Sequence, residues 1–139
     1  MTAKAYQQYF ETRIQTASPG HLLVMLYDGL LRFLKQTRRG LEQGDADTAR
    51  MAADRAAAIL QELVATLNLE TGEIAANLLL LYEFSLTRLL QAQLKREPEM
   101  LDAAIQALET LRDAWHQIAV SAAPTQSQTP AATPAAAIL

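Results

Sequence analysis

The sequence predicts an all-α protein, an antiparallel up-down-up-down four-helix bundle preceded by an N-terminal arm or short helix. Apolar residues recur at three- and four-residue spacing in four long segments, as expected for helices with a buried face. Glycine and proline are few and fall mainly between those segments. The segments are joined by short connections, which favour antiparallel neighbours in a bundle.

Residues 19–43 carry the clearest helix signature. Ser18 can act as the N-cap, because its hydroxyl can accept from the first free backbone amides, and Pro19 suits the first helical position. Gly44 is a typical residue at which such a helix ends. Apolar side chains surround most of this helix, which indicates burial on more than one side. We expect the second burial to be against another chain.

The second and fourth helices are expected to be ordinary amphipathic helices. The second opens at Asp45 or Asp47 and ends near Leu67, with small and branched apolar residues on one face. The fourth starts at residues 97–98, Glu-Pro, and runs to about Val120. Neither pattern indicates more than one buried face.

The third helix, like the first, has apolar side chains around most of its circumference. Thr71 is the expected N-cap, Glu73 suits the positive end of the helix dipole, and the pattern continues to about Lys95. Most residues between these limits are apolar, and few polar ones mark an outer side. Two of the four helices therefore carry more apolar surface than one core requires.

The sequence divides into three parts: residues 1–17 as an arm, residues 18–120 as the bundle, and residues 121–139 as a disordered tail. The first part contains Tyr9 and Ile14, and it is either a frayed terminus or an arm that docks on the domain's own apolar surface. The last part is rich in Pro, Ala and Thr, and it cannot bury enough apolar surface to offset its ordering entropy.

Length and charge exclude several classes of protein. The chain has 139 residues, which suits one domain, and its formal net charge of −3 gives no footprint for nucleic acid. It has no cysteine, which fits a reducing compartment and excludes thiolate metal sites. No signal peptide is visible, and no apolar run approaches the roughly 20 residues that membrane insertion requires.

The sequence contains no constellation typical of an enzyme. A di-metal bundle requires two Glu-x-x-His pairs on facing helices, and the nearest match is a single Asp113-x-x-His116. His116 also lacks the neighbours of a phosphotransfer histidine, and His21 lies in a first helical turn, where it is solvated or caps the helix. We therefore predict no catalytic residue, no metal and no cofactor.

The surplus apolar surface is the candidate site. An exposed patch of that size would be a liability on a monomer, so we expect a partner to cover it, either a client peptide or a second copy in a homodimer. The predicted groove is lined by residues of the first and third helices: Leu22, Met25, Gly29, Phe33, Leu79, Leu80, Phe84, Leu86 and Leu90.

Three polar residues lie near these apolar faces. They are Asp28, Asn77 and Arg88. Each either satisfies a partner at a helix crossing or orients a peptide that docks in the groove.

Several blocks of this sequence resemble the flagellar secretion chaperone FliS family. The first reads Thr16-Ala-Ser-Pro-Gly-His-Leu-Leu-Val-Met-Leu-Tyr-Asp-Gly-Leu, followed by Phe33. Further blocks are Leu67-Asn-Leu-Glu, Gly72-Glu-Ile-Ala-Ala-Asn-Leu, Leu81-Tyr82-Glu-Phe and residues 108–118. The resemblance spans roughly residues 5–120. One departure is Glu70-Thr-Gly-Glu, one glycine short of the family's usual turn.

The resemblance implies a cytoplasmic, non-enzymatic export chaperone. Family members bind the disordered C-terminal segment of flagellin, prevent its premature polymerisation and help deliver it to a flagellar type III export gate component. The resemblance also implies that the arm with Tyr9 and Ile14 covers part of the groove. The alternative is a helical-bundle adaptor or dimerisation module for another protein client.

Overall fold

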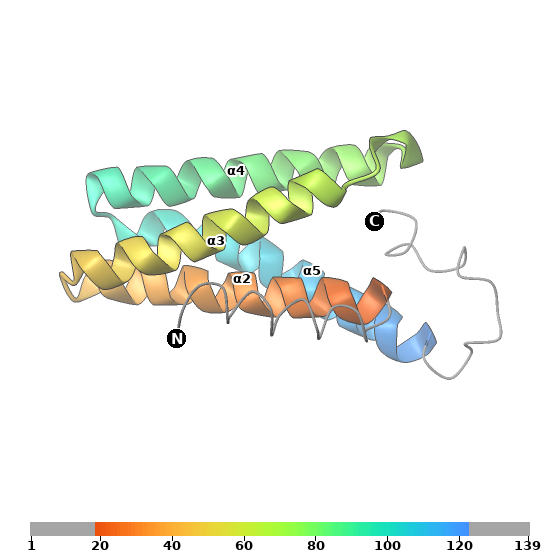
Figure 1. Ribbon diagram of the computed structural model, residues 1–139, viewed down its shortest axis with the longest axis horizontal. Helices are drawn as coiled ribbons and strands as arrows, with labels where there is room; N and C mark the ends of the chain where they lie inside the picture. The colour runs from red at the N-terminus through yellow and green to blue at the C-terminus, as the bar shows by residue number, and fades with distance from the viewer. Residues whose placement is uncertain (1–18, 123–139) are drawn as a thin grey trace.

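The computed structural model describes residues 19–122, and these residues form an all-α bundle of four long helices with two short 3₁₀ turns. The predicted fold class is confirmed, and neighbouring long helices run antiparallel (Figure 1). The elements are α2 (Pro19–Glu42), α3 (Ala46–Thr66), η1 (Leu69–Thr71), α4 (Glu73–Lys95), η2 (Pro98–Leu101) and α5 (Asp102–Ala122). The predicted arm, the Ser18 cap and residues 123–139 of the predicted tail lie outside the described residues.

The connection between α2 and α3 follows the sequence signals closely. Gly44 adopts a left-handed φ of 71°, which lets the chain reverse after α2. Asp45 is the N-cap of α3, which is one of the two starts that the sequence predicted. Its carboxylate accepts from the backbone N–H of Thr48 at 3.1 Å and from the Thr48 hydroxyl at 2.7 Å.

The start of α4 differs from the prediction. Thr71 is not its N-cap, because Thr71 belongs to η1 and its hydroxyl donates to the backbone oxygen of Asn68 at 2.7 Å. Gly72 holds the cap position instead, with a φ of 108° that favours glycine. The other end of α4 is set by Arg96, whose left-handed φ of 55° ends the helix before η2.

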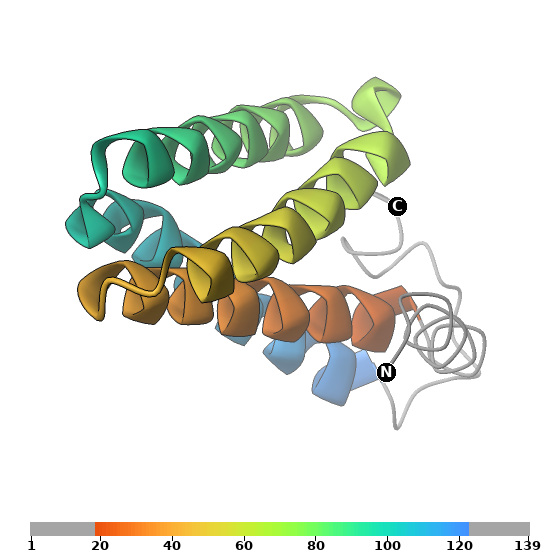
Figure 2. The same cartoon turned by 60° about the vertical axis from the view of Figure 1, so that its left-hand side comes forward.

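Helix α2 is the centre of the bundle and lies against both α3 and α5 (Figure 2). Its glycines permit close approach. A Cβ at Gly40 would lie 2.9 Å from the backbone nitrogen of Ala49 on α3, and one at Gly20 would lie 3.2 Å from Cβ of Ala119 on α5. The expectation that another chain covers the second side of this helix is therefore wrong for most of α2. Its flanks join the core of the chain itself: Val24, Leu31 and Phe33.

Helix α4 is less enclosed than α2. It packs against α3, η1 and η2 and has little backbone contact with α5. Helices α2 and α4 are diagonal neighbours, and they meet in the interior where the hydroxyls of Tyr27 and Tyr82 lie 2.7 Å apart. Trp115 of α5 packs edge-on against the Tyr27 ring, with 6.4 Å between ring centroids. One side of α4 thus packs against the core, and the opposite side faces away from the core.

Candidate binding surface

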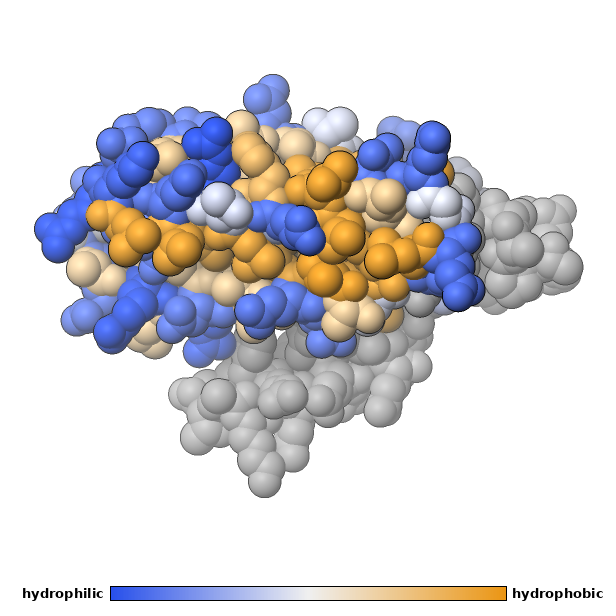
Figure 3. Space-filling view, turned by 90° about the horizontal axis from the view of Figure 1, so that it is seen from above, coloured by the Kyte–Doolittle hydropathy of each residue, from blue (hydrophilic) through white to orange (hydrophobic). Residues whose placement is uncertain are grey.

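The outward side of α4 carries a band of large apolar side chains. At about 100° per residue, four of them fall within roughly one third of the helix circumference. In the space-filling view an apolar band runs along this face of the molecule (Figure 3). We call these four residues the α4 strip, with their exposed fractions: Leu80 64%, Phe84 37%, Leu90 57% and Leu94 74%.

Leu79 and Leu86 lie at the edge of the α4 strip. Both are half-buried, and Leu86 also packs against the core. They therefore join the interior to the outer face. Neither residue is sealed inside the chain.

Two of the predicted polar residues lie on the same helix. Arg88 is half-buried, and its guanidinium carbon lies 5.1 Å from the centroid of the Phe84 ring, in cation–π geometry. Asn77 is exposed on α4. Both lie on the helix that carries the α4 strip.

The predicted residues of α2 fall into two groups. Gly29 and Phe33 are buried rather than groove-lining, which corrects the expectation for these two positions. A Cβ at Gly29 would meet Ile59 of α3 at 3.3 Å, and the Arg55 guanidinium lies 5.8 Å from the Phe33 ring centroid.

Leu22 and Met25, the other two predicted α2 residues, are partly exposed. They lie near the start of α2, and α3 runs obliquely away from this end toward α4 (Figures 1 and 2). Leu22 and Met25 form a second partly exposed apolar surface, on a different helix from the α4 strip, and α3 packs against both helices.

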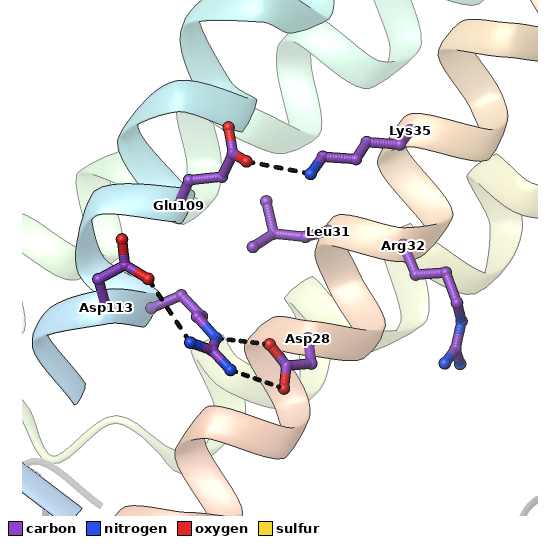
Figure 4. Close-up of a pocket in the computed structure, with 7 residues that line it drawn as sticks. Asp28, Leu31, Arg32, Lys35, Glu109 and Asp113 are labelled. Carbon is purple, nitrogen blue, oxygen red and sulfur yellow. Dashed lines mark hydrogen bonds and ion pairs between the residues drawn. The ribbon is translucent and has the colours of Figure 1, made fainter. Parts of the chain in front are cut away.

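Asp28 belongs to a different face, the seam between α2 and α5. Arg112 of α5 donates to it from Nε at 2.7 Å and from Nη2 at 3.4 Å, and also pairs with Asp113 at 3.5 Å. Lys35 pairs with Glu109 at 3.0 Å across the same seam. Figure 4 shows these groups around a shallow hollow that also includes Leu31. Asp28 therefore has a partner at a helix crossing, the first of its two predicted roles.

Other site classes can be checked on residues 19–122. Within that range no group of three or more His, Asp or Glu side chains is arranged to hold a metal ion. None of the helices there combines the length and the apolar character needed to cross a bilayer. Tyr9 and Ile14, the predicted cover of the groove, lie outside the described residues.

Sequence reasoning missed part of the exposed apolar surface. Leu94 is the most exposed large apolar residue of α4 and was not predicted, although Leu80 and Leu94 are separated by two heptads, which place them on one line. Ile74, in the first turn of α4, is also exposed, at 56%. The spacing of Leu80 and Leu94 was thus the signal that could have predicted Leu94.

Comparison with known proteins places this chain in a family. The family model described as "Flagellar protein FliS" matches residues 2–122. The chain is 38% identical over 128 residues to the "Flagellar secretion chaperone FliS" of Salmonella typhimurium (strain LT2), covering 90% of this chain and 95% of that protein. It is 34% identical over 112 residues to the protein of the same name from Bacillus subtilis (strain 168), covering 81% and 84%. The chain therefore belongs to the FliS family of flagellar secretion chaperones.

Proposed function

We propose that this chain is a cytoplasmic chaperone that binds the disordered C-terminal segment of flagellin. Binding would keep the segment from polymerising early and present it to a component of the flagellar type III export gate. Membership of the FliS family supports a flagellar client. The observation that carries the proposal is the α4 strip, an exposed apolar band on a helix whose other side already closes the core.

The strip suits helix-in-groove recognition. An amphipathic segment places apolar residues at three- and four-residue spacing, and Leu80, Phe84, Leu90 and Leu94 offer a matching line of apolar side chains. The driving force is the removal of apolar area from water, at about 25 cal/mol per Å². No chemical step is involved, and the proposed role is that of a binding protein, not an enzyme.

A disordered client needs more than one contact. Ordering such a segment costs about 2–5 kcal/mol or more of the gross interaction energy, so a long interface is required. The second apolar surface, at Leu22 and Met25, supplies it if the client continues around the bundle past α3. Leu79 and Leu86 extend the first surface, and Asn77 and Arg88 orient the peptide there. Tyr9 and Ile14 are proposed to cover part of this area when no client is bound.

The proposal is tested by titration of the chain with the isolated C-terminal peptide of flagellin. The expected result is saturable binding together with an increase in helical circular dichroism, because the client folds as it binds. Full-length flagellin should bind and flagellin without its C-terminal segment should not. Equal binding of both flagellins contradicts the proposal.

A homodimer is the competing occupant of the α4 strip. Sedimentation of the chain with and without the peptide distinguishes a second copy from the client as the occupant of the α4 strip. A dimer that persists at saturating peptide would show that the second copy and the client use different surfaces, whereas dissociation would show a shared one.

A further inference from the structure

We infer that the α4 strip selects a partner helix with a basic residue, Lys or Arg, in the middle of its apolar face, and that Glu83 is the residue that selects it. This inference rests on the proposed function in one respect, the use of the strip to bind a helix. It adds the charge pattern of the partner and a specificity residue for the interaction.

Glu83 lies inside the apolar strip rather than beside it. Its position on the helix falls between those of Leu90 and Leu94 around the circumference, at about 100° per residue. Along the axis, Leu80 precedes it by three residues and Leu90 follows it by seven. Its side chain is exposed. A helix that covers the strip must therefore also cover this carboxylate.

The Glu83 carboxylate has no hydrogen bond or ion pair within residues 19–122, and only the backbone oxygen of this residue accepts, from the Thr87 hydroxyl at 3.0 Å. Acidic groups on the α2–α5 face differ: Asp28 and Glu109 are each held by a cation. Arg88 is five residues away and lies over the Phe84 ring. The carboxylate is thus available to an incoming cation.

Desolvation makes this carboxylate selective. An apolar helix on the strip would remove water from an ionised group without replacing its hydrogen bonds, which is strongly unfavourable. A Lys or Arg from the partner replaces that water with an ion pair. A single charged position in an otherwise apolar seam also fixes the register of two helices, because only one alignment pairs the charges.

The same feature argues against a second copy as the occupant. Among the described α4 residues from 80 to 94, the exposed side chains include no Lys or Arg; they are Leu80, Glu83, Phe84, Thr87, Leu90 and Leu94. Two strips facing one another would therefore bring two carboxylates together, and the one cation in residues 80–94, Arg88, is half-buried over its own Phe84 ring. The chemistry of the strip fits a different chain with a basic residue.

The inference is tested with two designed amphipathic peptides that differ only by Lys or Glu at the central position of the apolar face. Wild-type protein should bind the Lys peptide about tenfold more tightly, equivalent to about 1.4 kcal/mol. Glu83→Lys should reverse the preference. Glu62→Lys, an exposed acid on α3, makes the same charge change away from the strip and should leave the preference intact.

Equal affinity for the two peptides, no binding of either, or an unchanged preference in Glu83→Lys would each overturn the inference. Titration of the same variants with the C-terminal flagellin segment separates this from the proposed function. Binding of that segment without discrimination between the designed peptides removes the inference and keeps the function. Discrimination between the designed peptides without binding of the flagellin segment keeps the inference and removes the proposed function.

Discussion

The hydroxyl oxygens of Tyr27 and Tyr82 lie 2.7 Å apart in the interior, and this contact joins two helices that do not pack along one another. Both side chains are almost fully buried, and their rings meet edge-on with centroids 6.3 Å apart. A buried hydroxyl needs a partner, and here one tyrosine hydroxyl donates to the oxygen of the other. The pair therefore fixes how α4 sits on the rest of the bundle, and with it the placement of the α4 strip.

Tyr82→Phe tests this link. The change removes one hydrogen bond and leaves the Tyr27 hydroxyl without its partner, so we expect a loss of about 1–3 kcal/mol in the free energy of unfolding. Urea denaturation followed by far-ultraviolet circular dichroism measures it. The double variant with Tyr27→Phe should cost less than the sum of the two single changes, because no unpaired hydroxyl remains. Strict additivity would show that the two hydroxyls do not interact.

The same pair predicts a loss of stability at alkaline pH. Burial raises the pKa of Tyr27, and burial together with the neighbouring Tyr27 raises the pKa of Tyr82. Both hydroxyls stay neutral in the folded chain, whereas tyrosine hydroxyls in the unfolded chain ionise near pH 10. Their contribution is complete below that value and is lost as pH rises above it, by up to about 1.4 kcal/mol per pH unit for each group.

Unfolding free energies between pH 8 and pH 11 give the measurement, with the Tyr27→Phe and Tyr82→Phe double variant as control. The wild-type curve should fall more steeply above pH 10 than that of the control. Parallel curves would mean that other groups carry the alkaline transition.

Much of this fold could be predicted because its signals are local. The Asp45 cap and the Gly44 stop depend on neighbouring residues alone, and the structure has both. The burial of the extra apolar surface on α2 could not be predicted, because it depends on how closely α3 and α5 approach that helix. That distance is set by Gly20 and Gly40 together with the small residues opposite them, a pairing distant in sequence. The exposed apolar surface predicted for α4 is present, since none of the helices within residues 19–122 covers Leu80, Leu90 or Leu94.

Leu80→Asp should weaken binding of the flagellin C-terminal peptide while the helical fold is kept. Leu80 is already 64% exposed, so the charge costs the free chain little, but it opposes burial in the complex. Loss of a buried leucine contact of about 1.5–3 kcal/mol corresponds to a roughly tenfold to hundredfold rise in Kd. Isothermal titration calorimetry measures it, with unchanged circular dichroism of the free variant as the check on folding.

Ala58→Asp supplies the matched control, since Ala58 is exposed on α3 and no predicted binding residue lies on that helix. Met25→Asp and Leu79→Asp should also weaken binding. Because both residues are half-buried, these two variants should also have a lower free energy of unfolding than the wild type. Wild-type affinity in Leu80→Asp would remove the α4 strip from the interface.

The α2–α5 seam should contribute little stability, and that little should depend on salt. Arg112→Gln removes its ion pairs with Asp28 and Asp113, but these groups are largely solvated, so we expect a loss of at most about 1 kcal/mol. The difference from wild type should shrink between 0.05 and about 1 M NaCl as screening grows. Peptide affinity should not change, because the seam is separate from the α4 strip. A loss of affinity would instead place the client on this face.

Removal of residues 1–14 tests the proposed cover. If Tyr9 and Ile14 compete with the client, the shortened chain should still bind the flagellin peptide and should associate faster, because no segment has to leave first. Stopped-flow mixing with a fluorescently labelled peptide measures the association rate. Tyr9→Ala with Ile14→Ala in the full chain should act in the same direction, which controls for the loss of chain length. Complete loss of binding in either variant would make these residues direct contacts of the client, and an unchanged rate would mean that they do not cover the site at all.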